Sequence, residues 1–424
     1  MLTRMAAIVF IFLCIAAAWA ALGGTVMHRT ATQDESLKTA VGQLWGTQQR
    51  QLAPHIYYQT VRQSRVETAQ GGKTVTEIKN ETVNHPLLLD GSDVKANLNL
   101  DYRQKGLLWY STYRVHFDSK YRVTNYTDAE REIFFDFSAP NQGGVYDNFR
   151  LVVGGKEIPN LPFNAGVLSH KIRLAPGQSE TIEVGYGSQG MDEWWYDFGN
   201  EVSQVKNFSL AMRTDFDQID FPQSSLSPTH RTQGSPGWEL KWQYANLLSG
   251  VKIGMVMPRK LNPGPWVSQI TFAAPVSLFL FFFVVFVLSA VKKIRLHPMN
   301  YFFIGAAFFS FHLLLAYLVD HVSIHVSFMI CSLVSIALVV SYLRLAVGNR
   351  FAFIEAGILQ FVYLVLFSYT FFFERFTGLA ITILCILTLF VVMQFTGRVD
   401  WDNLFRRGPT AEAGAAPRSI KDEG

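Results

Sequence analysis

The sequence predicts an α-helical membrane bundle of six transmembrane helices, joined to an all-β, antiparallel, sandwich-like domain. Three observations lead to this fold class. A stretch rich in Phe and Leu fills residues 270–395, a shorter apolar segment lies near the N-terminus, and alternating polar and apolar residues occur between them. An apolar helix of about 20 residues spans the hydrocarbon layer, whereas alternation with period two is typical of strands.

Short polar connectors divide the C-terminal apolar stretch into five segments, each long enough for a membrane-spanning helix. Backbone groups in lipid must form their hydrogen bonds within the segment. Connectors as short as Asp320–His321 and Glu374–Arg375 therefore leave room only for antiparallel helical hairpins. The predicted helices are Ile270–Val291, Phe302–Val319, Val322–Leu343, Phe351–Phe373 and Phe376–Phe395.

The N-terminal apolar segment, Met5–Val26, is long enough to span a membrane and is interpreted as an uncleaved anchor. The alternative is a cleaved signal peptide, because Ala18-Trp19-Ala20 matches the small-x-small cleavage pattern. Beyond the anchor, Gln33–Gln51 has apolar residues at helical spacing and predicts an amphipathic stalk that continues the first helix. The apolar residues of this stalk are Leu37, Val41, Leu44 and Trp45.

Basic residues in the short connectors predict the orientation. All but Arg375 fall on one side if the chain crosses the membrane six times. By the positive-inside rule, both termini are expected in the cytoplasm and Thr30–Pro265 on the opposite side. The basic residues on the predicted cytoplasmic side are Arg4, Lys292, Lys293, Arg295, Arg344, Arg350, Arg398, Arg406 and Arg407.

These segments predict an N-terminal anchor (residues 1–29), a β domain that begins with the amphipathic helix (30–265), a five-helix transmembrane domain (266–396) and a disordered cytoplasmic tail (397–424). The net charge of +4 is small and dispersed, which argues against nucleic-acid binding. All three cysteines lie in apolar segments, so the β domain is expected to contain no disulfide.

Strands without intervening helical patterns favour an antiparallel β-sandwich between the anchor and the bundle. The region is long enough for one large sandwich or for two stacked ones, with a boundary near Tyr126–Glu130. One predicted strand, Trp238–Tyr244, would place three aromatic residues and a leucine on one face. The other clear alternations are Thr74–Ile78, Val115–Phe117, Ile172–Leu174 and, after a turn at Pro176-Gly177, Ile182–Val184.

Motifs for catalysis or metal binding are absent from the sequence: there is no His-Glu-x-x-His, Gly-x-Ser-x-Gly, phosphate-binding loop or paired-cysteine spacing. We therefore predict no catalytic residue, metal site or cofactor. An acidic and aromatic cluster supplies the candidate binding residues Trp194, Trp195 and Tyr196, because such clusters can hold a sugar or a cation. The alternative is a loop whose aromatic side chains pack on the domain or touch the membrane interface.

Polar residues inside apolar helices are costly and each needs an explanation. His312 and Glu355 differ in predicted depth by roughly 10 Å and should not pair, whereas Gln360 lies near the depth of His312. Glu355 lies near Gln394 and is expected to join a cluster with Arg350 and Arg398. We interpret these residues as interhelical hydrogen-bonding groups, with a proton or ion path as the alternative. The candidate residues are His312, Glu355, Gln360 and Gln394.

Two further patterns occur near the fourth predicted helix. His321 and His325 would share a face, which makes a metal site conceivable, although no further ligand is close in sequence. Ser327, Cys331 and Ser335 recur every fourth residue, and this small face favours a close helix contact.

Several motifs together resemble one protein family. In the membrane region these are Arg295-Leu-His-Pro-Met-Asn-Tyr301, Leu318-Val-Asp-His321 and Gly397-Arg-Val-Asp-Trp401. In the β domain they are Pro86-Leu-Leu-Leu-Asp-Gly-Ser-Asp-Val94 and Arg103-Gln-Lys-Gly106, followed by Tyr110 and Tyr113. Over most of its length the chain resembles the bacterial inner-membrane CreD family of cell envelope integrity proteins. It departs from that pattern at Thr214–Pro222, where such proteins tend to have Trp-Pro-His-Pro-Ser-Phe.

The resemblance implies an inner-membrane protein with a periplasmic β domain, linked to envelope stress and tolerance of colicin-type toxins, and it supplies no catalytic residue. We predict a non-enzymatic protein whose partners are the lipid bilayer and an envelope component. One alternative is a transporter or channel with a water-lined cavity at His312, Gln360 and Glu355. Others are a sensor that signals through the stalk, and an enzyme acting on periplasmic glycan or peptide.

Overall fold

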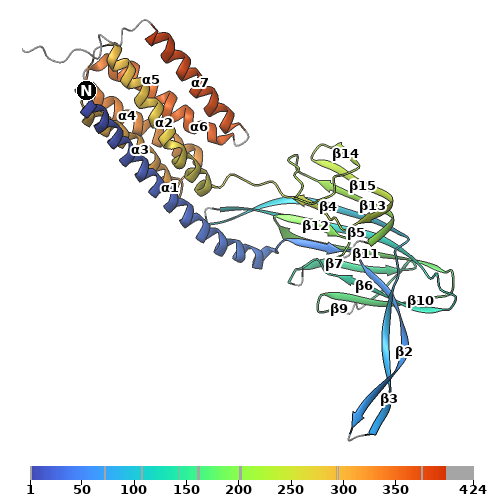
Figure 1. Ribbon diagram of the computed structural model, residues 1–424. Helices are drawn as coiled ribbons and strands as arrows, with labels where there is room; N and C mark the ends of the chain where they lie inside the picture. The colour runs from blue at the N-terminus through green and yellow to red at the C-terminus, as the bar shows by residue number, and fades with distance from the viewer. Residues whose placement is uncertain are drawn as a thin grey trace, which may run out of the picture. The chain divides into compact units, whose positions relative to one another are not determined.

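The chain divides into two compact units, which we call the helical unit (Met1–Gln33 with Asn262–Gly424) and the β unit (Asp34–Leu261). Helix α1, Leu2–Trp45, contributes to both (Figure 1). The computed structural model describes residues 2–70, 73–106, 108–141, 143–159, 163–199, 203–292, 294, 296–373 and 376–397. Lys293, Arg295, Arg375, Arg398 and the predicted tail beyond Gly397 therefore lie outside the described residues.

The described residues include six helices long and apolar enough to cross a membrane, as the sequence predicts. Two of them begin earlier than expected, α2 at Pro263 and α3 at Pro298. Proline is well tolerated in the first turn of a helix, so each helix can begin at its proline. The fifth helix, Phe351–Phe372, is irregular and alternates between π, α and 3-10 turns. The helices after α1 are α2 (Pro263–Val291), α3 (Pro298–Leu318), α4 (Ile324–Ala346), η1 (Phe351–Ala356), α5 (Gly357–Gln360), η2 (Phe361–Leu366), α6 (Phe367–Tyr369), η3 (Thr370–Phe372) and α7 (Thr377–Thr396).

Two arginines on α1 mark which connectors share an end of the helical unit. The Arg4 guanidinium donates a hydrogen bond to the Leu296 carbonyl, in the connector between α2 and α3. At the other end, Arg29 forms an ion pair of 3.1 Å with Asp320, in the connector between α3 and α4. The beginning of α1 therefore lies at the same end of the unit as the α2–α3 connector.

The β unit contains three sheets. The largest has eight strands in the order β14-β15-β13-β4-β5-β11-β7-β8, the second has the order β3-β2-β6-β10-β9, and the third has the order β1-β12-β16. The strands are β1 (Gln49–Leu52), β2 (His55–Gln70), β3 (Lys73–Pro86), β4 (Gly91–Lys105), β5 (Leu108–Thr124), β6 (Arg131–Ser138), β7 (Tyr146–Val153), β8 (Lys156–Glu157), β9 (Phe163–Asn164), β10 (Val167–Leu174), β11 (Ser179–Met191), β12 (Glu193–Asp197), β13 (Ser203–Thr214), β14 (His230–Gln233), β15 (Trp238–Ser249) and β16 (Ile253–Val256).

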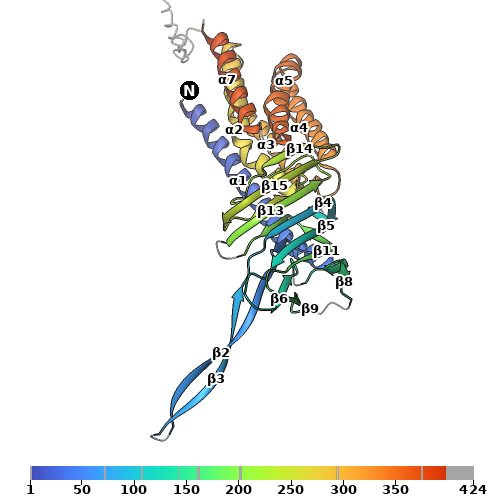
Figure 2. The ribbon, with the colours of Figure 1, turned by 90° about the vertical axis from the view of Figure 1, so that its right-hand side faces the viewer.

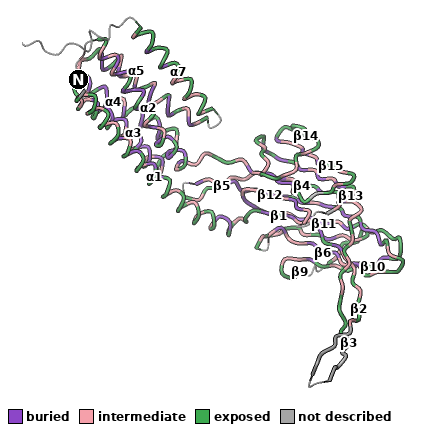
Figure 3. The backbone as a smooth tube through the Cα atoms, viewed as in Figure 1, coloured by how far each residue is buried: buried purple, intermediate pink, exposed green. Residues whose placement is uncertain are grey.

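One hydrophobic core joins the three sheets. The ring of Phe117 on β5 lies 6.3 Å from that of Phe137 on β6 and 6.5 Å from that of Trp194 on β12. The strand β15 adds Leu240 and Trp242 to this core, which confirms the face predicted from its alternation. Buried positions alternate with more exposed ones along strands such as β4 and β6, and Figure 3 shows buried segments on the central strands of the β unit. The boundary expected near Tyr126–Glu130 does not divide this core.

The strand pairing corrects the prediction in one respect and adds to it in another. The sheets are not wholly antiparallel, because β1 pairs with β12 and β13 pairs with β4 in parallel. The strands that flank the Pro176-Gly177 turn, β10 and β11, belong to different sheets. Gly177 occupies the left-handed region at a φ of 73°, which permits the sharp change of direction between the two sheets.

A long two-stranded ribbon extends from the β unit (Figure 2). Strand β2 pairs with β6 only over His55–Tyr58, whereas its pairing with β3 continues from Tyr57 opposite Pro86 to Gln70 opposite Lys73. The predicted strand Thr74–Ile78 lies within β3. Beyond Tyr58 the ribbon therefore depends on its own cross-strand pairing.

Candidate functional site

The last turns of α1, which belong to the β unit, pack on its strands through one helical face. Leu37, Val41 and Trp45 form a small apolar cluster with Leu108, Tyr110 and Met191. Residues spaced by four lie on one side of a helix, so this part of the predicted stalk is confirmed. The prediction is wrong for Leu44, which is 77% exposed because it points away from that face.

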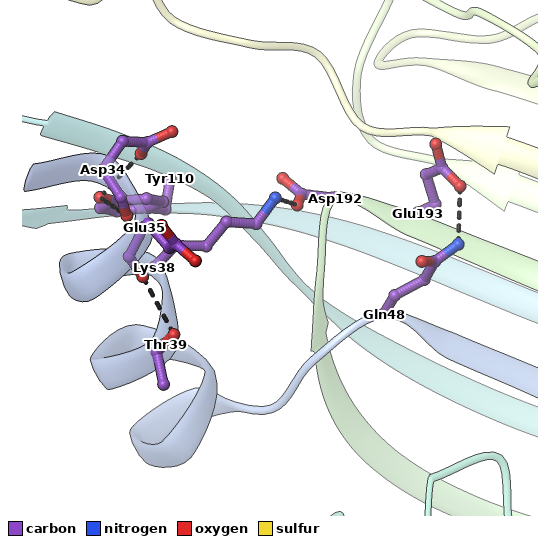
Figure 4. Close-up of polar contacts among 8 residues, drawn as sticks. All are labelled: Asp34, Glu35, Lys38, Thr39, Gln48, Tyr110, Asp192 and Glu193. Atoms are coloured by element: carbon purple, nitrogen blue, oxygen red, sulfur yellow. Dashed lines mark hydrogen bonds and ion pairs between the residues drawn. The ribbon is translucent and has the colours of Figure 1, made fainter. Parts of the chain in front are cut away.

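Polar contacts reinforce this packing (Figure 4). The Lys38 ammonium lies 2.6 Å from a carboxylate oxygen of Asp192, and the Tyr110 hydroxyl donates to Asp34 over 3.1 Å. Burial, together with the hydrogen bond to Asp34, raises the pKa of Tyr110 well above its ordinary value. Strand β12 and its flanking residue Asp192 are thus attached directly to the end of α1.

A glycine makes the change from helix to strand possible. Gly46 has a φ of 112°, and a Cβ there would lie 2.3 Å from the Gln189 carbonyl oxygen. Only a residue without a side chain fits this backbone conformation and this contact. The chain leaves α1 here and enters β1 at Gln49.

Strand β1 places alternate residues on opposite faces of the third sheet. In its parallel register with β12, Gln49 lies opposite Trp194, Arg50 opposite Trp195 and Gln51 opposite Tyr196. The first and third pairs are buried, with Trp194 at 0% and Tyr196 at 1% exposure. Because successive side chains alternate, Arg50 and Trp195 lie on the face opposite the core.

A cleft of about 350 Å³ opens on that opposite face and is lined by Gln48, Arg50, Trp195 and Lys252. Behind it lies Asp197, a carboxylate whose side chain is only 1% exposed. Asp197 accepts hydrogen bonds from Arg50 and lies 3.4 Å from the Lys252 ammonium. The Arg50 and Lys252 side chains remain 43% and 36% exposed, so both cations contact the solvent in the cleft.

Neighbouring groups hold the indole of Trp195 in place. Its Nε1 donates to a carboxylate oxygen of Glu193 over 2.8 Å, and Gln48 donates to the same oxygen over 2.7 Å. On the adjacent strand, Trp195 lies opposite Gly254, where a Cβ would come within 2.7 Å of the ring. The absent side chain therefore leaves room for the indole to pack on the backbone of β16.

The structure separates the three aromatic residues singled out from the sequence. Trp194 and Tyr196 lie in the core, where a ligand cannot reach them, and only Trp195 lines the cleft. The cluster is a strand and not the loop considered as the alternative. Sequence reasoning did not find Arg50 or Lys252, since residues this distant in the chain meet only through sheet pairing.

Two of the candidate polar residues of the helical unit, His312 and Gln360, are buried and form hydrogen bonds inside the protein. His312 is 1% exposed; its Nδ1 lies 3.0 Å from the Phe308 carbonyl and its ring lies 5.3 Å from that of Trp19. Gln360 donates to the Ser335 hydroxyl over 2.9 Å, and Ser335 in turn donates to the Ala307 carbonyl over 2.7 Å. This chain of bonds connects the fifth helix to α4 and α3.

Glu355 lies among basic residues, as predicted, but its direct partner is Lys292, just after the C-terminal end of α2. The charge of Arg350, one of the two predicted partners, also acts on the Glu355 carboxylate, and the other, Arg398, lies outside the described residues. Gln394 is exposed on α7. The depth estimate was right that Glu355 and His312 are not partners, but depth alone cannot show which helices are neighbours.

Two patterns were singled out near α4: a histidine pair that made a metal site conceivable, and a face of small residues. The His325 ring stacks on Phe372 at 4.9 Å, and no group of three or more His, Cys, Asp or Glu residues in the described part of the chain is arranged to hold a metal ion. Ser327, Cys331 and Ser335 are fully buried, as expected for a close contact between helices. The hydrogen bond from Ser335 to Ala307 shows that α3 is one of the neighbours.

The fold places the chain among helical membrane proteins that carry a large β-rich unit between the first and second apolar helices. A family model described as inner membrane protein CreD matches residues 1–189 and 271–402. The chain belongs to this family of inner membrane proteins, which confirms the resemblance found in its motifs.

No curated protein matches the chain. Among solved structures, a putative nutrient-binding protein of Legionella pneumophila is 9% identical, with a TM-score of 0.30, and the match covers 53% of this chain and 82% of that one. An M1 zinc metallopeptidase of Deinococcus radiodurans is 11% identical, with a TM-score of 0.21, over 78% of this chain and 98% of that one. Neither likeness is close enough to carry an argument about fold or function.

Proposed function

We propose that this CreD-family protein is a non-enzymatic envelope-maintenance protein whose β unit binds an envelope component on the periplasmic side of the inner membrane. The observation that carries the proposal is α1, a single helix of 44 residues. Its first part is apolar enough to span a bilayer, and its last turns pack on strands of the β unit. A binding module tethered to the membrane in this way is suited to contact with structures close to the membrane surface.

The proposed orientation rests on the distribution of basic residues. Arg4 contacts the α2–α3 connector, so the start of α1 and Lys292 belong to the same end of the helical unit. Arg344 and Arg350 flank the connector that follows α4, which should lie at that end too. The positive-inside rule places this end, and with it both termini, in the cytoplasm. The β unit then lies in the periplasm.

Cysteine labelling in intact cells tests the orientation. In a variant without the three native cysteines, Val61→Cys and Leu345→Cys provide exposed positions on the ribbon and beside the α4 connector. A membrane-impermeant maleimide is added to cells whose outer membrane is permeabilised and whose inner membrane is intact. It should label position 61 in these cells and position 345 only after lysis. Labelling of position 345 in intact cells would contradict the proposed topology.

Loss of the protein tests the proposed role. Deletion of the gene should increase leakage of a periplasmic enzyme under mild detergent stress, and expression of the full chain should restore retention. The matched control is a protein that lacks the β unit. In it, the part of α1 that belongs to the helical unit is joined to α2 by a short linker. Restoration by this control would show that the β unit is not the binding module.

A sensor is the second candidate, and the contacts at the end of α1 favour it. Strand β12 contributes Trp195 to the cleft. Asp192, the residue just before this strand, pairs with Lys38 on α1. A change at β12 could therefore reach the helix through one ion pair. In contrast, the cleft that Glu355 lines is otherwise apolar and includes neither His312 nor Gln360, which gives no support to the transporter alternative.

A further inference from the structure

We infer that the cleft lined by Gln48, Arg50, Trp195 and Lys252 binds an acidic saccharide, that is, a sugar ring that carries a carboxylate or a phosphate. The inference rests on the proposed function, because it names the class of envelope component that the β unit would bind. The inference is supported by the groups that meet in this cleft: the exposed cations of Arg50 and Lys252 and the Gln48 amide lie beside the Trp195 indole. All are on the face of the sheet opposite the core.

The charges that face the cleft are positive. Arg50 and Lys252 share a single carboxylate, Asp197, which lies behind the cleft and is 1% exposed. Asp197 occupies only part of the donor capacity of the two cations, because a guanidinium carries five N–H donors and an ammonium three. The remaining donors suit a carboxylate or phosphate group, and arginine binds such planar or forked anions in a bidentate way.

Glu193, the other nearby carboxylate, is already engaged. One of its oxygens accepts hydrogen bonds from both Trp195 and Gln48. The effect of this carboxylate is to orient the indole and the amide, so that both have a defined position before a ligand arrives. Groups that are held in place lose less conformational entropy on binding than free side chains.

The aromatic component indicates a sugar ring and not a bare anion. One side of the Trp195 indole packs where Gly254 lacks a side chain, and the residue also lines the cleft. An indole beside hydrogen-bonding groups offers an apolar plane for the C–H face of a sugar, with polar side chains at its edge for the hydroxyls. A volume of about 350 Å³ lies at the lower end of the range for small-molecule sites and suits one or two sugar rings.

Ligand-observed NMR on the full chain in detergent micelles tests the inference. The probes are glucuronate, glucose 6-phosphate, glucose, acetate and inorganic phosphate. We expect at least one of the two acidic saccharides, glucuronate or glucose 6-phosphate, to bind. Glucose, acetate and inorganic phosphate should bind at least about tenfold more weakly, since each lacks either the charge or the ring. Preference for glucuronate or for glucose 6-phosphate would identify the anionic group. Absence of binding by both, or equal binding of glucose or of the free anions, would overturn the inference.

Variants locate the site. Lys252→Gln and Trp195→Ala should each weaken binding of the acidic saccharide at least about tenfold. Lys171→Gln on β10, which removes an exposed lysine paired with Glu132, is the matched control and should leave binding unchanged. Lys252→Gln keeps the Arg50–Asp197 pair, so this variant should fold normally and remain informative if Trp195→Ala does not. Unchanged binding by Lys252→Gln would place the ligand elsewhere.

Gly254→Ala provides a further test, because the new Cβ would meet the indole without removing any group that lines the cleft. Saccharide binding by this variant should weaken about as much as binding by Trp195→Ala, and full binding would show that the position of the indole does not matter.

A failure of these tests is distinguishable from a failure of the proposed function. If no saccharide binds but the chain still restores enzyme retention only when the β unit is present, the proposed function stands and the ligand class is wrong.

Discussion

The two units use their polar side chains in different ways. In the helical unit, Gln360 and Ser335 are fully buried and are hydrogen-bonded to each other and to the backbone of another helix. In the third sheet of the β unit, Arg50 and Lys252 keep more than a third of their side-chain surface exposed above a buried carboxylate. The buried polar groups of the helical unit thus join one helix to another, whereas those on the outer face of β12 and its neighbours remain accessible, as the proposed binding role of the β unit requires.

The largest expected effect separates the two faces of β12. Trp194→Ala removes a fully buried indole from the core and should lower the free energy of unfolding of the β unit by about 3–5 kcal/mol. Trp195→Ala removes a half-buried indole from the cleft and should cost about 1 kcal/mol. Thermal unfolding followed by near-UV circular dichroism measures both. Equal losses of stability would show that the faces of this strand are not distinct.

Alkaline pH should destabilise the β unit through its buried tyrosines. Burial raises the pKa of Tyr113, Tyr186 and Tyr196 well above the ordinary value of 10.0 and raises that of Tyr121 to about 12. Below pH 10 both folded and unfolded chains keep these protons, so the full stability is present. Above pH 10 the unfolded chain releases protons that the folded core retains, and stability falls by up to about 1.4 kcal/mol per pH unit for each group.

A pH titration of unfolding from pH 8 to pH 12 checks this prediction. Tyr196→Phe removes one of the titrating groups and should make the alkaline loss of stability less steep. Stability that stays constant up to pH 12 would contradict the assignment of these hydroxyls to the core.

A smaller effect is expected in the helical unit. Gln360→Met removes the hydrogen bond to Ser335 and should destabilise the unit by about 0.6–2 kcal/mol, because hydrogen bonds between helices in membranes are individually modest. Gln394→Met, on the exposed surface of α7, is the matched control and should change little. Unfolding by increasing mole fraction of sodium dodecyl sulfate measures the difference. If both variants lose the same stability, the buried bond has no special role.

The smallest effect concerns the contact between α1 and the strands. Lys38→Met breaks the ion pair with Asp192 and should cost less than about 1 kcal/mol, since 47% of the Lys38 side chain is exposed to screening by water and salt. The loss should shrink further between low and high ionic strength. A large loss that does not depend on salt would show that Lys38 contributes through packing.

The helical unit could be predicted from the sequence because apolar length is a local property. All six apolar segments were found, although α2 begins at Pro263 and not at Ile270, and the small face of Ser327, Cys331 and Ser335 correctly indicated a helix contact. Partners across helices were less predictable. Glu355 was placed by depth among the basic residues at one end of the bundle, but depth did not show that its direct partner is Lys292, which follows α2.

In the β unit, individual strands were predictable but their pairing was not. Alternation identified β15 and its apolar face, yet it could not show that β10 and β11 enter different sheets or that β1 and β12 are parallel. For the same reason the cleft was only partly predictable. Trp195 stood out in its local sequence, whereas Arg50 and Lys252 look like ordinary solvated charges until the sheet brings them together.

The alternation of Trp194, Trp195 and Tyr196 along β12 also bears on how this protein can diverge from its relatives. Trp194 and Tyr196 face the interior, so replacement of either one disturbs side chains from several strands at once. Trp195 faces outward, and it can be exchanged for another residue with little effect on the interior. If the outer face binds an envelope component as proposed, a lineage can therefore alter what this face recognises while it inherits the inner face unchanged.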